Sequence, residues 1–120
     1  MSPLHRSQLL KGTTELLILS VLEDEPRHGY EIAQLIHARA AGLALSDGAL
    51  YPALHRLEKR GALDGWWQPG SGGPRRRYYT LTDEGRGLLA DARQEWDRFV
   101  SEVGSVAGAA HVALAEARRV

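Results

Sequence analysis

The most informative stretch of this chain is SDGALYPALHRLEKRG, which runs from Ser46 to Gly61. Leu50, Leu54 and Leu57 recur at spacings of four and three, so they share one side of a helix over residues 46–60. The hydroxyl of Ser46 can cap the N-terminus of this helix, and Gly61 is a stop signal at its other end. The stretch therefore predicts a short amphipathic helix with one buried side.

The opposite side of this predicted helix is polar. Arg56 and Lys59 suit contacts with phosphate or guanine, and Tyr51 and His55 can donate hydrogen bonds to phosphate or to base edges. Ala49 lies on the same side. A solvated helix surface has a similar composition, so position alone leaves both interpretations open.

Pro52 conflicts with a regular helix. It lies beyond the first turn, where a proline removes a helical hydrogen bond. We therefore expect either that the helix starts late, near Gly48, or that its first turn is irregular.

Hydrophobic spacing and turn residues divide the rest of the chain into further elements. Helices are predicted over residues 9–22, 29–41 and 82–103, with Gly42 as a left-handed end of the second. A β-hairpin is predicted over residues 62–81, with strands Ala62–Trp67 and Arg76–Leu81 and a flexible tip at 68–74. This order predicts an α+β, mostly α fold: a winged helix-turn-helix with a long C-terminal dimerisation helix.

The domain organisation follows from these elements. Residues 9–81 are expected to form the DNA-binding domain, 82–103 the dimerisation helix, and 104–120 a tail or short helix. The helix over 9–22 is apolar on most sides and the terminal helix has a broad apolar stripe, so both are expected to need a second subunit. The predicted dimer interface comprises Leu16, Leu17, Leu19, Leu89, Ala92, Trp96, Phe99, Val100 and Val103.

Positive charge is concentrated in the middle of the chain. The net charge of the whole chain is zero, but residues 46–81 carry a net charge of +3. Arg75, Arg76 and Arg77 are adjacent. Three neighbouring cations repel one another and gain nothing from the folding of the hairpin itself. They could contact phosphate or a narrow minor groove, or they could protect a strand edge from unwanted pairing.

Composition excludes several other classes of protein. The chain has no cysteine, and its five histidines show no spacing typical of a metal site. It has no stretch long enough to cross a membrane and no signal-peptide core, so the cytoplasm is the expected compartment. We find no catalytic motif, so we expect neither an enzyme nor a cofactor.

The three tryptophans are candidates for a ligand site. Trp66 and Trp67 are adjacent in a predicted strand and must face opposite ways, so one of them is expected in the core. Trp96 lies on the terminal helix. Aromatic faces attract planar cations, but aromatic residues more often pack a core or an interface.

Several motifs together resemble the PadR family of bacterial transcriptional regulators. They are Lys11-Gly12-Thr13, His28-Gly29-Tyr30-Glu31, Gly48-Ala49-Leu50-Tyr51-Pro52-Ala53-Leu54-His55-Arg56-Leu57-Glu58 and Arg77-Tyr78-Tyr79-Thr80-Leu81-Thr82-Asp83-Glu84-Gly85. The resemblance covers about residues 9–100 and is similar to the short subfamily with one C-terminal helix. The resemblance implies a winged helix-turn-helix dimer that represses transcription. Members of this family carry a proline in the recognition helix, where this chain has Pro52.

The resemblance also implies functional residues. Tyr30, Ser46, Tyr51, Pro52 and the exposed side of the third helix are expected at the DNA, and the hairpin arginines at the backbone or minor groove. Some short members bind flat aromatic or cationic drugs between tryptophans at the dimer interface. In this chain the candidate tryptophans for such a ligand site are Trp66, Trp67 and Trp96.

The sequence thus predicts a sequence-specific DNA-binding repressor that acts as a homodimer on a palindromic operator of double-stranded DNA. The first alternative is a sensor of small aromatic ligands that releases DNA when the ligand binds. The second alternative is a protein-interaction module on the same scaffold, which the zero net charge favours.

Overall fold

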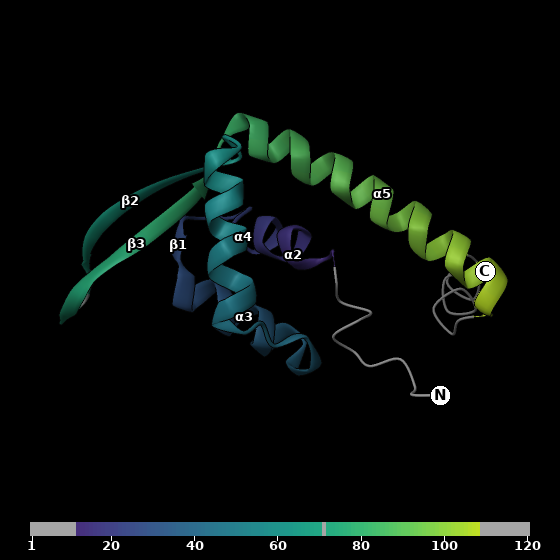
Figure 1. Cartoon of the computed structure of the whole chain (residues 1–120), viewed down its shortest axis with the longest axis horizontal. Coiled ribbons are helices and arrows are strands. Elements are labelled where there is room, and N and C mark those ends of the chain that lie inside the picture. Colours follow the sequence, from purple (N-terminus) through teal and green to yellow (C-terminus); the bar gives the residue numbers. More distant parts are fainter. Residues whose placement is uncertain (1–11, 71, 109–120) are drawn as a thin grey trace. The chain divides into compact units, whose positions relative to one another are not determined.

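The computed structural model describes residues 12–70 and 72–108 (Figure 1). Its elements, in chain order, are helix α2 (Thr14–Val21), strand β1 (Arg27–His28), helix α3 (Gly29–Arg39), a 3-10 turn η1 (Ala41–Leu43), helix α4 (Asp47–Lys59), strands β2 (Leu63–Gly70) and β3 (Gly73–Leu81), and helix α5 (Asp83–Ala107). The chain divides into two compact units between Leu89 and Ala90. The elements confirm the expected α+β, mostly helical class with a long C-terminal helix.

The core of the first unit is made by three helices and the base of the hairpin. Its largest fully buried side chains are Ile18, Leu19, Leu22, Ile32, Leu50, Leu54, Leu57 and Leu63. All three leucines of the predicted stripe on α4 are therefore buried, as their spacing indicates. Burying that stripe fixes which side of α4 remains exposed.

The first two helices differ from their expected bounds. Helix α2 begins at Thr14, and residues 9–11 of the predicted helix lie outside the described residues. Helix α3 ends at Arg39 because Ala40 adopts an extended conformation. The prediction that Gly42 takes a left-handed conformation was wrong, since Gly42 lies in η1 and the described glycines with positive φ are Gly12, Gly61, Gly72 and Gly108.

Helix α4 begins at Asp47, one residue before the late start near Gly48 that was one of the two alternatives for Pro52. The hydroxyl of Ser46 accepts a hydrogen bond from the backbone N–H of Ala49, which is the expected cap. Pro52 lies inside the helix. A proline here cannot donate a hydrogen bond to the carbonyl of Gly48, four residues earlier, and Gly48 is an exposed residue. Gly61, with φ 89°, ends this segment as predicted.

The hairpin is longer than predicted and joins a third strand. The antiparallel sheet has the order β1-β3-β2, with Arg27 opposite Tyr79 and His28 opposite Tyr78. Strands β2 and β3 pair as far as Gly70 and Gly73, so most of the expected flexible tip is strand. Figure 1 shows that this hairpin leaves the helices and extends away from them. Isolated polar residues such as Arg27 and His28 gave no strand pattern, which explains why β1 was missed.

Helix α5 also exceeds its predicted length. The Thr82 hydroxyl accepts a hydrogen bond from the Gly85 N–H and caps the helix, as expected. The helix continues through Gly104 to Ala107, and Gly108, with φ 68°, follows it. The prediction that residues after Val103 leave this helix was wrong for 104–107, while 109–120 lie outside the described residues.

Two findings concern the described residues only. No helix among them is long and apolar enough to cross a membrane. In the same part of the chain, no group of three or more His, Asp or Glu side chains could hold a metal ion.

Candidate nucleic-acid interface

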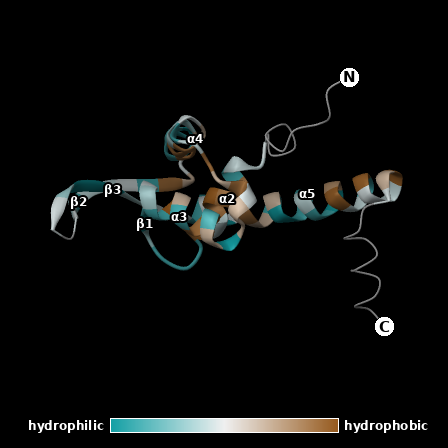
Figure 2. Ribbon diagram, turned by 90° about the horizontal axis from the view of Figure 1, so that it is seen from below, coloured by the Kyte–Doolittle hydropathy of each residue, from teal (hydrophilic) through white to brown (hydrophobic). Residues whose placement is uncertain are grey.

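The exposed side of α4 carries the predicted contact residues. Tyr51 is 49% exposed, and Ser46, Pro52, His55, Arg56 and Lys59 are exposed as well, while Ala49 is half-buried. Figure 2, in which α4 is viewed nearly along its axis, shows hydrophilic residues on its outer side. A helix of this kind, with one polar side facing water, has the dimensions that fit a DNA major groove.

Arg56 is already paired within the chain. Its Nε lies 3.3 Å from Oε1 of Glu15 on α2, and the Arg56 side chain is 60% exposed. An exposed ion pair of this kind contributes little to stability, so a phosphate could replace Glu15 as the partner at small cost. Lys59, one turn further along α4, is also exposed.

The three hairpin arginines alternate between the two faces of β3. Arg77 is opposite Trp67 and Arg75 opposite Pro69, whereas Arg76 is opposite Gln68. The guanidinium carbons of Arg75 and Arg77 lie 5.6 Å and 5.7 Å from the centre of the Trp67 ring. These distances are within the range of cation–π attraction, so the ring holds both side chains on one face of the sheet.

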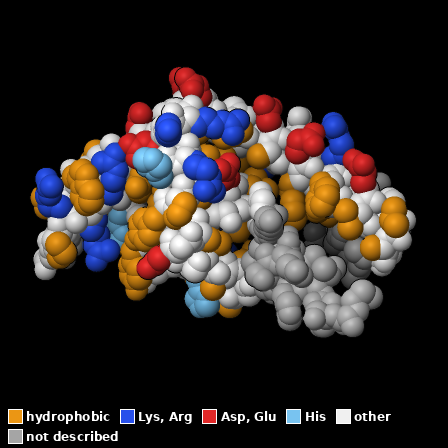
Figure 3. Space-filling model, viewed as in Figure 1, with side chains coloured by type: hydrophobic (Ala, Val, Ile, Leu, Met, Phe, Trp, Pro, Cys, Tyr) orange, Lys and Arg blue, Asp and Glu red, His pale blue; other side chains and the backbone are white. Residues whose placement is uncertain are grey.

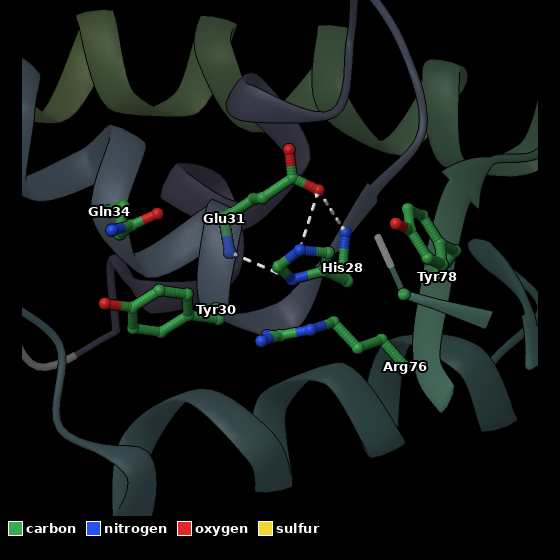
Figure 4. Close-up of a pocket in the computed structure, with 7 residues that line it drawn as sticks. His28, Tyr30, Glu31, Gln34, Arg76 and Tyr78 are labelled. Atoms are coloured by element: carbon green, nitrogen blue, oxygen red, sulfur yellow. Dashed lines mark hydrogen bonds and ion pairs between the residues drawn. The ribbon is translucent and has the colours of Figure 1, made fainter. Parts of the chain in front are cut away.

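Arg76 points to the other face of the hairpin. Its guanidinium carbon lies 5.8 Å from the centre of the Tyr30 ring, and Figure 4 shows the side chain reaching from β3 toward Tyr30. Tyr30 itself is 56% exposed at the start of α3. This arrangement leaves the Arg76 guanidinium in solvent beside an aromatic ring, close to the helical part of the domain.

His28 fixes the start of α3 beside Arg76. Its Nδ1 accepts a hydrogen bond from the backbone N–H of Glu31, and the carboxylate of Glu31 accepts one from the backbone N–H of His28. This capping box is visible in Figure 4, where the His28 ring lies between Tyr30 and Tyr78. Its ring stacks with Tyr30 and meets Tyr78 edge-on. The sequence prediction missed this role, which the spacing of His28 and Glu31 could have indicated.

A groove connects the hairpin with both helices. It has a volume of about 220 Å³ and is lined by His28, Gly29, Tyr30, Tyr51, Trp67, Arg75, Arg76, Arg77 and Tyr79. Gly29 leaves space for Tyr51, because a Cβ at Gly29 would lie 2.9 Å from Cε1 of that ring. Burial raises the pKa of Tyr79 above its ordinary value. Arginine, phenol and aromatic ring edges together suit a sugar-phosphate strand.

Lysine and arginine side chains gather over the hairpin and over α4 on the face shown in Figure 3. This distribution agrees with the excess of positive charge in residues 46–81. A chain with no net charge can therefore still present a basic surface, which steers the polyanionic backbone of nucleic acid.

The comparisons with known proteins identify a family. The model of the transcriptional regulator PadR-like family matches residues 18–91, which include all of α3, α4 and the hairpin. The chain belongs to the PadR-like family. It is therefore a transcriptional regulator with a winged-helix DNA-binding fold, and not an enzyme.

Relatives of this PadR-like regulator cover most of its length. It is 34% identical over 103 residues to the transcriptional regulator Rv3488 of Mycobacterium tuberculosis, covering 86% of this chain and 92% of the relative. Among solved structures, a PadR family transcription regulator from Clostridium difficile R20291 is 36% identical with a TM-score of 0.68, covering 82% of this chain and 100% of the other. A transcriptional regulator from Clostridium thermocellum is 30% identical with a TM-score of 0.73, covering 81% and 95%.

The two hairpin tryptophans of this PadR-like regulator are placed differently from the prediction. Neither Trp66 nor Trp67 is buried, so the expectation that one of them lies in the core was wrong. Trp66 stacks on Tyr78 at 6.2 Å between ring centres, and Trp67 is 56% exposed. The reason is their position along the hairpin, because the sheet contributes to the core only near its base, at Leu63, Tyr79 and Leu81.

Some of the predicted dimer residues lie in the first compact unit and the others lie in the second. Leu19 and Leu89 are buried in the core, so packing within the chain accounts for both and neither is retained as an interface residue. Leu16 and Leu17 are half-buried and pack against the same core. On the second unit Ala92 and Val100 are half-buried, whereas Trp96, Phe99 and Val103 are exposed.

Proposed function

We propose that this PadR-like regulator is a repressor that binds a palindromic operator as a homodimer. Residues 9–81 would form the DNA-binding domain, and the helix predicted at 82–103, which extends to Ala107, would form the dimer contact. Each subunit would place α4 in one major groove, with half-sites about one helical turn apart. The observation that carries the proposal is the groove in which Tyr51 of α4 meets Arg75 and Arg76 of the hairpin.

The geometry supports separate roles for α4 and the hairpin. Tyr51, His55 and Lys59 follow one another along the exposed side of α4, where they can reach base edges and flanking phosphates. Tyr30 and Ser46 lie at the starts of α3 and α4, where exposed polar groups can position the backbone. Arg75 and Arg76 are exposed on opposite faces of β3 and suit phosphate or a narrow minor groove.

An apolar stripe on α5 supports the homodimer. Trp96 and Phe99 are 41% and 60% exposed, and their ring centres lie 6.4 Å apart. Val103 and Val106 are 46% and 92% exposed. Large apolar side chains gathered along one helix favour burial against a second copy of the same helix.

The test of DNA binding compares two variants that remove the same number of charges. We expect wild-type protein to shift DNA from upstream of its own gene, and Arg75→Ala with Arg76→Ala to weaken binding to every sequence. The slope of log affinity against log salt should fall by about 0.9 for each phosphate that the variant no longer neutralises. The control is Arg93→Ala with Arg98→Ala, two exposed positions on α5. An unchanged affinity and salt slope in the hairpin variant would show that Arg75 and Arg76 do not touch DNA.

The test of repression is a reporter gene fused to that upstream DNA. Expression should rise when the regulator is deleted and fall when the gene is restored. A two-fold symmetric footprint, with protected segments about 34 Å apart along the helix axis, is expected on the same DNA. A single protected half-site, or lower expression in the deletion strain, would contradict the homodimeric repressor.

A second candidate is a sensor of small aromatic ligands. It is favoured by the exposed Trp96–Phe99 pair, which presents two aromatic faces to solvent. Trp66 and Trp67 already contact Tyr78 and the hairpin arginines, which makes them weaker candidates. Quenching of tryptophan fluorescence by planar cationic compounds, lost in Trp96→Phe and retained in Trp66→Phe, would support this function. Quenching that both variants retain would contradict it.

A further inference from the structure

The third hairpin arginine differs from its two neighbours. Nη2 of Arg77 donates a hydrogen bond to Oε2 of Glu58, which lies on α4, and the two side chains are 29% and 30% exposed. Arg75 and Arg76 are exposed and rest on aromatic rings of the hairpin and α3. Arg75 and Arg77 share the Trp67 ring, but of the three arginines only Arg77 is also paired with α4.

Several features hold the Arg77–Glu58 pair in place. The guanidinium carbon of Arg77 lies near two aromatic rings, 5.7 Å from the centre of Trp67 and 5.9 Å from that of Tyr79. The hydrogen bond to Glu58 raises the pKa of Arg77 further above its ordinary value. Charge-assisted hydrogen bonds with partial burial are stronger and more directional than exposed ones.

Gly65 on β2 provides the space for this pair. A Cβ at Gly65 would lie 2.8 Å from Nη2 of Arg77 and 3.0 Å from Oε1 of Glu58. The backbone of Gly65 has no positive φ, so no turn requires a glycine there. The absence of a side chain at this position allows the ends of two long side chains, from α4 and β3, to meet over the sheet.

We propose that the Glu58–Arg77 pair sets the direction of the hairpin relative to α4, and that Arg77 is a positioning residue rather than a DNA contact. The hairpin extends away from the helices beyond its base, so a tie between β3 and α4 controls where Arg75 and Arg76 lie when α4 occupies the major groove (Figure 1). This inference rests on the proposed function, in which α4 and the hairpin bind one DNA duplex together.

The proposal predicts an effect opposite to that of charge alone. Glu58→Gln removes a negative charge near the DNA, which by electrostatics should tighten binding. If the pair positions the hairpin, Glu58→Gln should instead weaken operator binding on the order of tenfold, because the hairpin loses its fixed direction. Arg77→Lys, which keeps the charge but not the planar fork, should behave similarly, and the double variant should be no weaker than either single one.

Gly65→Ala tests the same idea without changing any charge. The added methyl displaces the Arg77–Glu58 pair, so operator affinity should fall because the hairpin is no longer held in its binding position before it meets the DNA. The salt slope should stay at its wild-type value, because Arg75 and Arg76 are still present and can still reach the same phosphates once bound. Gly73→Ala on the same hairpin is the control, because a Cβ at Gly73 meets nothing within 4 Å. A salt slope reduced in Arg77→Lys or Gly65→Ala to the same extent as in Arg75→Ala, or a Glu58→Gln variant that binds as tightly as wild type, would overturn the proposal.

Hydrogen exchange in the free protein separates this inference from the proposed function. Amides of β2 and β3 beyond Gly65 should exchange faster in Glu58→Gln and Gly65→Ala than in wild type, while those of α4 should not change. Unchanged exchange in the hairpin would overturn the positioning role even if the protein binds DNA. If the two variants exchange faster than wild type but the wild-type protein binds no DNA, the positioning role stands and only the proposed function is refuted.

Discussion

Helices α4 and α5 are both amphipathic, but they differ in what covers their apolar sides. On α4, Leu50, Leu54 and Leu57 are at most 1% exposed, so the first unit buries the whole stripe. On α5, Phe99 is 60% and Val106 is 92% exposed. The same kind of pattern thus has two outcomes, because α2, α3 and the sheet surround α4, whereas the second half of α5 presents apolar side chains to solvent.

This difference indicates which side of each helix is available for function. A helix whose apolar side is fully buried offers its polar side, and α4 offers Tyr51, His55 and Lys59. A helix with an exposed apolar side offers that side to a partner, and we propose that this partner is a second copy of α5. The contrast predicts that substitutions on α4 act on folding or DNA binding, whereas those on the α5 stripe act on assembly.

The largest effect is expected in the core beneath α4. Leu54→Ala should lower the free energy of unfolding by about 2–5 kcal/mol, because Leu54 is completely buried and the cavity left behind collapses only in part. Chemical denaturation followed by circular dichroism measures it. Lys59→Ala on the exposed side of the same helix is the control and should change stability by less than about 0.5 kcal/mol. Similar losses in both variants would show that α4 is not divided into a buried and an exposed side.

A smaller effect on stability, but a large one on assembly, is expected on α5. Phe99→Ala with Val103→Ala should weaken dimerisation by about 2 kcal/mol or more, since large apolar residues at an interface centre contribute most of its binding energy. The first unit should keep its fold, because neither residue belongs to its core. Sedimentation equilibrium measures the dimer dissociation constant. Arg98→Ala is the control, and a double variant that remains as dimeric as wild type would contradict the proposed interface.

The smallest effect is expected at the start of α4. Ser46→Ala removes the side-chain acceptor for the Ala49 N–H and should lower the free energy of unfolding by about 1 kcal/mol. Ser46→Asp should restore most of the loss, since aspartate is an equally good cap and adds a favourable charge at the helix N-terminus. Thermal denaturation of the three proteins distinguishes the cap from a generic surface change, in which Ser46→Asp would bring no recovery.

Much of the fold could be predicted from local patterns. The leucine spacing predicted α4, and Ser46, Gly61 and Thr82 predicted where elements begin or end. Errors occurred where distant segments decide the outcome. Strand β1 has only two residues and exists because β3 pairs with it, and the hairpin tip forms strand because cross-strand pairing extends to Gly70. The error at the end of α5 has a local cause, because helix propagation carries α5 past Gly104 despite the low helix propensity of glycine.

The candidate site shows the same division. Its residue types were evident in the chain, since exposed polar groups opposite a leucine stripe and a run of arginines are patterns of local sequence. The partners of these residues were not evident from the sequence. Nothing in the order of residues shows that Arg77 pairs with Glu58, that Arg76 rests on Tyr30, or that Leu19 and Leu89 belong to the core rather than to an interface.

Local sequence by itself determined where the helices lie, the caps at Ser46 and Thr82, and the family, because backbone hydrogen bonding, capping and side-chain periodicity act over a few neighbouring residues. Only the tertiary structure decided which of three consecutive arginines is held by α4 and which two are left exposed. Strand alternation sends neighbours to opposite faces, and packing between segments far apart in the chain determines what each face meets.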